Sequence, residues 1–435
     1  MQTAVSPGEF RRYAAPGVLG MIGISCYILA DTFFVAKGTG SLGLAALNIA
    51  IPAYNLMNGL GLMVGVGGAT HYSLCRAQGD TAEADRTFTH TLLLGLCIAL
   101  VFVLTGTFGV VPLSRLLGAN AETLDMTAVY LRLLLCFAPF FVTNNIMIAF
   151  VRNDGEPGRA MAGMIAGSLF NIVFDWVFIF PCGLGMFGAA LATGASPLVS
   201  LLVLSGHLRR PSRGRPSRGF HLRRERLRPH LLPRICAPGL SSLISELASG
   251  ITLLLINLVL LRIAGNTAVA AYGVIANLAL VESAIFTGLS TGVQPLISRS
   301  AEADRRRLLR WTVTTALVIS ALMYVLVFVF ASPITAVFNS EHDPALAACA
   351  VPGLRIYFAG FLAACINIIA AAYFSAAGQA SRGFIISLVR SIIAIPPVLF
   401  ALSALLGVTG VWLTFPAVEA LACVLSLLFI LRSPK

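Results

Sequence analysis

The chain has 435 residues, of which 57% are hydrophobic and 11% are charged, and its formal net charge is +12 at pH 7. The charged fraction is about half that of a soluble globular domain, so the composition excludes an ordinary soluble protein and indicates a polytopic membrane protein. The positive charge does not indicate a nucleic-acid partner, because the basic residues gather in loops between apolar runs. Nine cysteines stand singly, without a C-x-x-C pair, which favours packing residues over disulfides or metal ligands.

Apolar windows between charged or turn-rich breaks predict twelve membrane-spanning helices, and therefore an all-α polytopic fold. The first window follows a polar stretch without a small-residue cleavage site, so we expect a permanent helix and no removed signal peptide. The first six spans are expected near residues 13–36, 43–70, 88–112, 124–150, 160–181 and 185–207. The second six are expected near residues 236–263, 267–297, 311–338, 351–376, 384–406 and 409–431.

These spans predict two six-helix lobes, residues 1–208 and 235–435, joined by a basic cytoplasmic linker at residues 209–234. If both termini are cytoplasmic, 24 of the 30 Lys and Arg residues lie on the cytoplasmic side, ten of them in the linker. Because Lys and Arg concentrate in cytoplasmic loops, we expect this orientation. The linker is expected to be solvated and to touch the lipid surface.

The two halves of the sequence repeat each other. Three ungapped alignments carry the repeat: Tyr130 onward with Gly353 onward, Gly40 onward with Gly265 onward, and Gly185 onward with Gly407 onward. Six is an even number of spans, so both halves run in the same direction and relate by an axis along the membrane normal. This arrangement is typical of rocking-bundle transporters, in which a central cavity lies between two pseudo-symmetric lobes.

Five of the 18 acidic residues lie inside predicted spans, namely Asp31, Asp175, Glu246, Glu282 and Glu419. A carboxylate near the centre of a spanning helix costs about 2.5 to 3.5 kcal/mol on insertion scales, so each of the five is a candidate for a function. At about 1.5 Å per residue, Asp31 and Asp175 lie roughly 9 and 12 Å from the outer ends of their spans.

Two further polar residues lie at comparable depth. Asn171 precedes Asp175 by four residues and shares its helix face, and Thr193 lies in the next span. We expect Asp31, Asn171, Asp175 and Thr193 to form an oxygen-rich pocket that holds a proton or a hard monovalent cation; no other metal is expected. Exchange between a protonated carboxyl and a cation-bound carboxylate could bias a two-state helix. The alternative is that both aspartates only make structural hydrogen bonds.

The acids of the second half do not copy those of the first, since the repeat places Ile256 opposite Asp31. Glu246 is expected near mid-membrane and Glu282 in the inner half of its span. These acids face either the interior of the second lobe or the shared cavity, where they would meet a cationic substrate. For Glu282 and Glu419, a snorkelling or capped side chain is an equal alternative.

Several segments together resemble a known family. They are DTFFVAKGTGSLGLAAL from Asp31, GLGLMVGVGGA before Arg76, Asn171-x-x-x-Asp175, GAALAT from Gly188, and PGLSSLISELASG from Pro238. These segments are similar to those of the multidrug and toxic compound extrusion (MATE) family, and the resemblance covers essentially the whole chain. The chain departs from the family pattern after span 8, at SRSAEADRRR, and at the unusual Glu282.

The resemblance implies a secondary active exporter with two six-helix lobes, located in a bacterial inner membrane and driven by inward flow of protons or sodium. It implies a first-lobe cation site at Asp31, Asn171, Asp175 and Thr193. It also implies a use for Glu246, which stands eight residues after Pro238 as a glutamate does in some members. No catalytic residue or cofactor is expected. The expected partners are small organic, cationic amphiphilic compounds and the lipid bilayer, and the chain is expected to be a monomer.

Two other functions stay open at this point. One is a flippase for a lipid-linked precursor, although such cavities are usually cationic and the buried charges here are mainly acidic. The other is an intramembrane aspartyl protease with Asp31 and Asp175 as a dyad that shares a proton. Neither aspartate follows a Gly-x-Gly, and a protease leaves the six-plus-six repeat unexplained.

Overall fold

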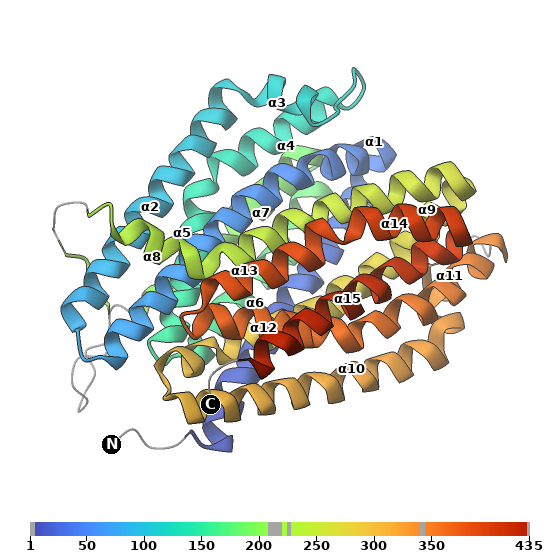
Figure 1. Ribbon diagram of the computed structural model, residues 1–435. Helices are drawn as coiled ribbons and strands as arrows, with labels where there is room; N and C mark the ends of the chain where they lie inside the picture. The colour runs from blue at the N-terminus through green and yellow to red at the C-terminus, as the bar shows by residue number, and fades with distance from the viewer. Residues whose placement is uncertain (1–4, 208–219, 224–227, 339–343, 433–435) are drawn as a thin grey trace.

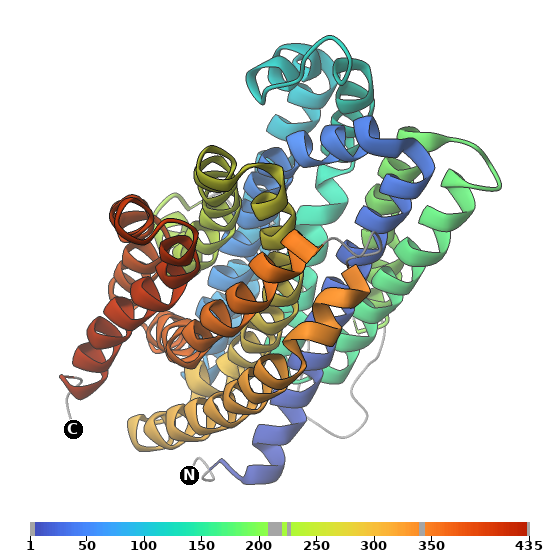
Figure 2. The ribbon, with the colours of Figure 1, turned by 90° about the vertical axis from the view of Figure 1, so that its right-hand side faces the viewer.

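The computed structural model describes residues 5–207, 220–223, 228–338 and 344–432. Within these ranges the chain forms a bundle of long helices that run side by side (Figure 1). The start of the first helix and the end of the last lie at the same end of the bundle, as a second view also shows (Figure 2). We refer to it as the terminal end. This placement agrees with an even number of crossings.

Seven helices belong to the first half of the chain. They are α1 (Pro7–Ala77), α2 (Thr81–Phe108), α3 (Val110–Leu116), α4 (Leu124–Cys136), α5 (Ala138–Asn153), α6 (Pro157–Ile179) and α7 (Gly185–Ser205). The second half has α8 (Leu231–Cys236), α9 (Leu240–Arg299), α10 (Glu302–Phe338), α11 (Pro344–Tyr357), α12 (Phe361–Ala376), α13 (Ala380–Leu388), α14 (Ile395–Leu406) and α15 (Val408–Leu431). A π-helical turn at Val389–Ile393 joins α13 to α14.

The described residues form eleven helical segments long and apolar enough to cross a membrane, and the pair α4 and α5, bent by 49°, makes a twelfth. The prediction of twelve spans is confirmed, with ends that differ from the expected ones by several residues. The bend between α4 and α5 lies just before Pro139, whose ring cannot fit inside a regular helix.

Each half opens with two spans that continue into one another at a glycine. The backbone turns at Gly40 in α1, with φ of 71°, and at Gly265 in α9, with φ of 70°. Glycine adopts this left-handed conformation without a Cβ clash. These are the two residues that the sequence repeat aligned, so equivalent positions redirect the chain in the same way in both halves.

Buried apolar side chains form two clusters, one for each half of the chain, and these are the cores of the two lobes. The lobes exchange short segments at their edges. Leu231 and Ile235 of α8 pack in the first-lobe core, whereas Phe10 and Tyr13 of α1 pack in the second-lobe core. The start of each half is therefore held by the other lobe.

Glycines allow the two lobes to touch backbone to backbone towards the terminal end. A methyl group on Gly17 of α1 would collide with Gly288 of α9, and one on Gly239 would collide with Met63 of α1. We call this contact the lobe seam. Small residues permit such close approach between helices in membranes. Each contact joins the start of one half to the second span of the other half, so glycines close both sides of the seam.

Most of the expected linker at residues 209–234 lies outside the described residues. Within it, α8 begins at Leu231, four residues before the expected start of the second lobe. The ring of Phe220 packs against Phe88 and Phe150 of the first lobe, with centroids 4.3 and 5.6 Å apart. The backbone N–H of His221 donates to Asp85 at 3.1 Å. This part of the linker is therefore docked on the first lobe.

Candidate functional site

Three helices of the first lobe bring the four predicted site residues together. Asp31 comes from α1, Asn171 and Asp175 from successive turns of α6, and Thr193 from α7. All four are buried, and Asn171 and Asp175 have no exposed surface. The carboxyl groups of Asp31 and Asp175 lie close enough to interact with each other. Asn171 Nδ2 donates to Thr193 Oγ1 at 3.2 Å.

The cluster has more oxygen acceptors than donors. Both carboxylate oxygens of Asp175, Asp31 Oδ1 and Asn171 Oδ1 are buried and accept no hydrogen bond from the described residues. Buried charges are normally paired or bound to a cation, and two adjacent carboxylates cannot both stay charged without one. The arrangement suits a proton shared between the aspartates, or a hard monovalent cation coordinated by oxygens.

Tyr130 of α4 is a further member of the cluster that sequence reasoning missed. Its buried hydroxyl lies close enough to interact with Thr193 and with the carboxyl groups of Asp31 and Asp175. The only signal in the sequence was depth, because Tyr130 lies about six residues, or roughly 9 Å, inside its predicted span. Depth alone does not separate this tyrosine from the many aromatic residues that pack in cores.

Two tyrosines lie between this cluster and Glu246. The hydroxyl oxygens of Tyr27 and Tyr54 are 3.2 Å apart. Tyr27 precedes Asp31 by one turn of α1 and lies close enough to interact with its charge. Tyr54, in the second span of α1, interacts with the charges of both Asp31 and Glu246. Polar groups therefore connect the first-lobe acids to the acid of α9.

Glu246 faces the first lobe across the boundary between the lobes. Its carboxyl group lies close enough to Asn58 in α1 to interact with it. Asn145 Nδ2 in turn donates to Asn58 Oδ1 at 2.9 Å. A Cβ on Gly59 would lie 3.1 Å from the Cβ of Glu246, so the two helices approach closely here. Glu246 therefore lies where α9 packs against α1 of the first lobe.

Glu282 lies inside the second lobe and has no exposed surface. Ser320 Oγ of α10 donates to its Oε1 at 3.4 Å, and Oε2 has no hydrogen-bond partner among the described residues. In this conformation Glu282 does not line a surface that a substrate could reach.

Glu419 lies in a polar network of the second lobe. Its carboxylate accepts hydrogen bonds from Asn367 Nδ2 at 2.7 Å and from Arg390 Nε at 3.1 Å, and Arg390 Nη2 donates to its other oxygen. Ser426 Oγ donates to Asn367 Oδ1 at 2.7 Å. Arg390 belongs to the π-helical turn, so the two intramembrane charges that sequence reasoning left apart pair with each other.

A multivalent metal ion would be held by several His, Cys, Asp or Glu side chains. Across the described ranges no three of these side chains lie close enough together to do so.

Comparisons with known proteins agree over nearly the full length. The sequence model of the MatE family matches residues 16–177 and 242–400. The chain is 28% identical over 424 residues to the multidrug export protein MepA of Staphylococcus saprophyticus, covering 96% of this chain and 92% of that protein. It is 27% identical over 426 residues to the protein of the same name from Staphylococcus aureus strain NCTC 8325, with the same coverage.

Solved structures show the same fold. The chain superposes with a TM-score of 0.88 on an outward-facing multidrug resistance MATE family transporter of the MOP superfamily, and with a TM-score of 0.89 on MATE in complex with MaL6. Both are 24% identical to this chain, and each match covers 97% of this chain and 94% of the other. At this identity the likeness concerns the fold, including its two-lobe arrangement.

Proposed function

The chain belongs to the MatE family, and on that premise we propose that it exports organic, cationic amphiphilic compounds in exchange for protons or sodium ions that flow inward. The resemblance to the MATE family is confirmed. Because members of this family are transporters, the protease hypothesis is set aside. Transporters of this family need no cofactor beyond the coupling ion. The relatives named as multidrug export proteins, similar over 96% of this chain, support the choice of substrate class.

The observation that carries the proposal is the paired carboxyl groups of Asp31 and Asp175 with their unsatisfied oxygens. An ion that enters this cluster removes the repulsion between the two acids, and an ion that leaves restores it. Asp31 lies on α1, the helix that also forms the lobe seam at Gly17. Ion binding at the cluster is thereby connected to the contact between the lobes, through one helix.

Alternating access would follow from opening and closing the lobe seam. We place the terminal end in the cytoplasm, because the termini and loops expected on that side account for 24 of the 30 basic residues of the sequence. The closed seam then corresponds to a state that faces outward. We place the protein in a bacterial inner membrane as a monomer, with a first lobe to residue 208, a linker at 209–234 and a second lobe from 235.

Substrate binding is assigned to the boundary between the lobes, at Glu246. Its carboxyl group and the hydroxyl of Tyr54 supply negative charge and a hydrogen-bonding partner there. A carboxylate attracts organic cations and disfavours the pyrophosphate of a lipid-linked precursor, which argues against a flippase. Glu419 is assigned a structural role because its charge is paired. Glu282 is an acid of the second-lobe interior without an assigned substrate contact.

The membrane potential can drive the exchange if net charge moves inward, and it supplies about 2.3 kcal/mol per charge per 100 mV. Purified protein in proteoliposomes loaded with ethidium tests the proposal. We expect efflux under an imposed pH gradient or an imposed sodium gradient, and none from protein-free liposomes. Absence of ethidium movement under both gradients, together with gradient-independent movement of a fluorescent lipid-linked pyrophosphate, would replace the exporter by a flippase.

A further inference from the structure

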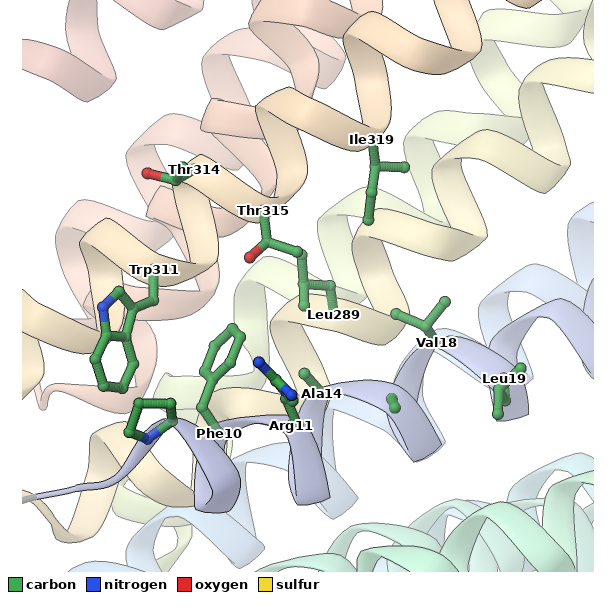
Figure 3. Close-up of a pocket in the computed structure, with 12 residues that line it drawn as sticks. Phe10, Arg11, Ala14, Val18, Leu19, Leu289, Trp311, Thr314, Thr315 and Ile319 are labelled. Carbon is green, nitrogen blue, oxygen red and sulfur yellow. The ribbon is translucent and has the colours of Figure 1, made fainter.

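A groove of about 740 Å³ lies between the first turns of α1 and the start of α10, with Leu289 of α9 at its base (Figure 3). It is separate from the acidic cluster and from Glu246. The groove joins the two lobes, because α1 opens the first half while α9 and α10 belong to the second. Leu289 directly follows Gly288, so the groove borders the lobe seam.

The walls of the groove are apolar along most of its length. Ala14 and Val18 of α1 form one wall and Ile319 of α10 the other, above Leu289 (Figure 3). The lining residues of α1 run from Pro7 to Leu19, which is roughly 18 Å at 1.5 Å per residue. Half of a typical hydrocarbon core is about 15 Å. The groove therefore has the length of one acyl chain in one leaflet.

The end of the groove nearest the chain start is basic and aromatic. Arg11 lines it and is exposed, and the guanidinium of Arg307 lies 4.7 Å from the ring centroid of Trp311. The rings of Phe10 and Trp311 meet edge to face, with centroids 5.8 Å apart. Tryptophan and arginine at this level are typical of the membrane interface.

Glu9 and Glu302, two acids near this basic end, are ion-paired with other arginines. Glu9 is ion-paired with Arg299. Arg12 is turned to the first lobe, where its Nη2 donates to the carbonyl oxygen of Gly155 at 3.3 Å. Glu302 lies within ion-pair distance of Arg305, at 3.7 Å. The mouth of the groove consequently presents the positive charges of Arg11 and Arg307.

We propose that this groove binds one anionic phospholipid of the leaflet at the terminal end. The headgroup phosphate lies between Arg11 and Arg307, and one acyl chain lies over Val18, Leu289 and Ile319. Basic pockets between membrane helices on the cytoplasmic side are suited to anionic headgroups. The inference rests on the membrane orientation proposed above and not on the transported compound or the coupling ion.

Tryptophan fluorescence tests the proposal, because the chain has three tryptophans in different surroundings. Trp311 lines the groove, Trp176 of α6 is 51% exposed, and Trp412 is buried. The Trp176→Phe/Trp412→Phe variant retains Trp311, and the Trp311→Phe/Trp412→Phe variant retains Trp176 as a matched control. Each is reconstituted in phosphatidylcholine with increasing fractions of dibrominated phosphatidylglycerol or dibrominated phosphatidylcholine, whose bromines quench nearby tryptophan.

We expect phosphatidylglycerol to bind next to Trp311 roughly 25 times more strongly than phosphatidylcholine, since each of the two basic residues near the surface contributes a factor of about five. Trp176 should be quenched equally by both lipids. Arg11→Gln should reduce the preference at Trp311 while leaving Trp176 unchanged. If the double variants fail to fold, the single Trp176→Phe variant serves, because buried Trp412 lies away from lipid.

Equal quenching of Trp311 by the two lipids would overturn the proposal, and so would a preference that survives Arg11→Gln combined with Arg307→Gln. A third outcome also counts against it. If the organic cation tetraphenylphosphonium relieved the quenching of Trp311 equally in both lipids, the groove would be assigned to the exported compound.

Discussion

Adding a single methyl group at the lobe seam should open it. In Gly288→Ala, the new Cβ would lie 2.5 Å from the carbonyl oxygen of Gly17 and 2.8 Å from the Cα of Val18. Both are backbone atoms of α1, so no side chain can turn away to make room. Overpacking of this kind costs about 1 to 3 kcal/mol. The strain is present only while the seam is closed, so it should shift the equilibrium between closed and open seams by roughly 5- to 150-fold.

Hydrogen–deuterium exchange of the purified protein measures this shift. We expect faster exchange in peptides that cover residues 10–22 and 285–299 of Gly288→Ala, because the open seam admits water. Gly273→Ala is the matched control, since it adds the same methyl group to the same helix where no atom lies within 4 Å. Unchanged exchange at the seam in folded Gly288→Ala would refute this account of the contact. Faster exchange throughout the chain would indicate unfolding instead.

Three further predictions concern other parts of the molecule. Glu419→Gln leaves Arg390 without its counter-charge inside the membrane, so the free energy of unfolding should fall by about 3 to 5 kcal/mol, and replacing both residues by leucine should restore part of the lost stability. Thermal unfolding in detergent measures the stability of the single and the double variant. Equal stability of the single variant and the wild type would contradict the pairing. Phe220→Ala should release the docked part of the linker and speed trypsin cleavage between residues 209 and 234. Leu222→Ala, at a side chain that is 67% exposed, should leave the cleavage rate unchanged. Equal cleavage rates in the two variants would contradict the anchoring role of Phe220. Tyr130→Phe removes the hydroxyl next to Thr193, and we expect a higher ion concentration for half-maximal export with substrate binding unchanged; an unaltered ion dependence would remove Tyr130 from the site.

The fold follows closely from patterns that the sequence displays. Hydropathy located twelve spans, since a membrane-spanning helix needs about twenty apolar residues whatever its neighbours are. The repeat anticipated that Gly40 and Gly265 would play equivalent parts, and both adopt the same left-handed conformation. The depth of charged residues along their spans brought Asp31 and Asp175 to the same level, and the structure places them side by side.

Contacts between distant segments were beyond the reach of these patterns. The pairing of Arg390 with Glu419 depends on how α13, the π-helical turn and α15 rotate about their axes, which hydropathy does not determine. The same holds for Tyr130, whose hydroxyl is distinguished from other aromatic side chains only by the direction in which α4 presents it. The basic charge of residues 209–234 predicted a solvated linker and gave no sign that Phe220 packs against Phe88 and Phe150.

We infer that Asp31 and Asp175 couple ion flow to export, and gradient-driven ethidium efflux from proteoliposomes tests this coupling most directly. Asp31→Asn and Asp175→Asn should insert normally and bind ethidium, but should show no efflux under the gradient that drives the wild type. Asp125→Asn, which makes the same change at an exposed residue of α4, should export like the wild type. Normal gradient-driven efflux by Asp175→Asn at equal protein density would contradict the account.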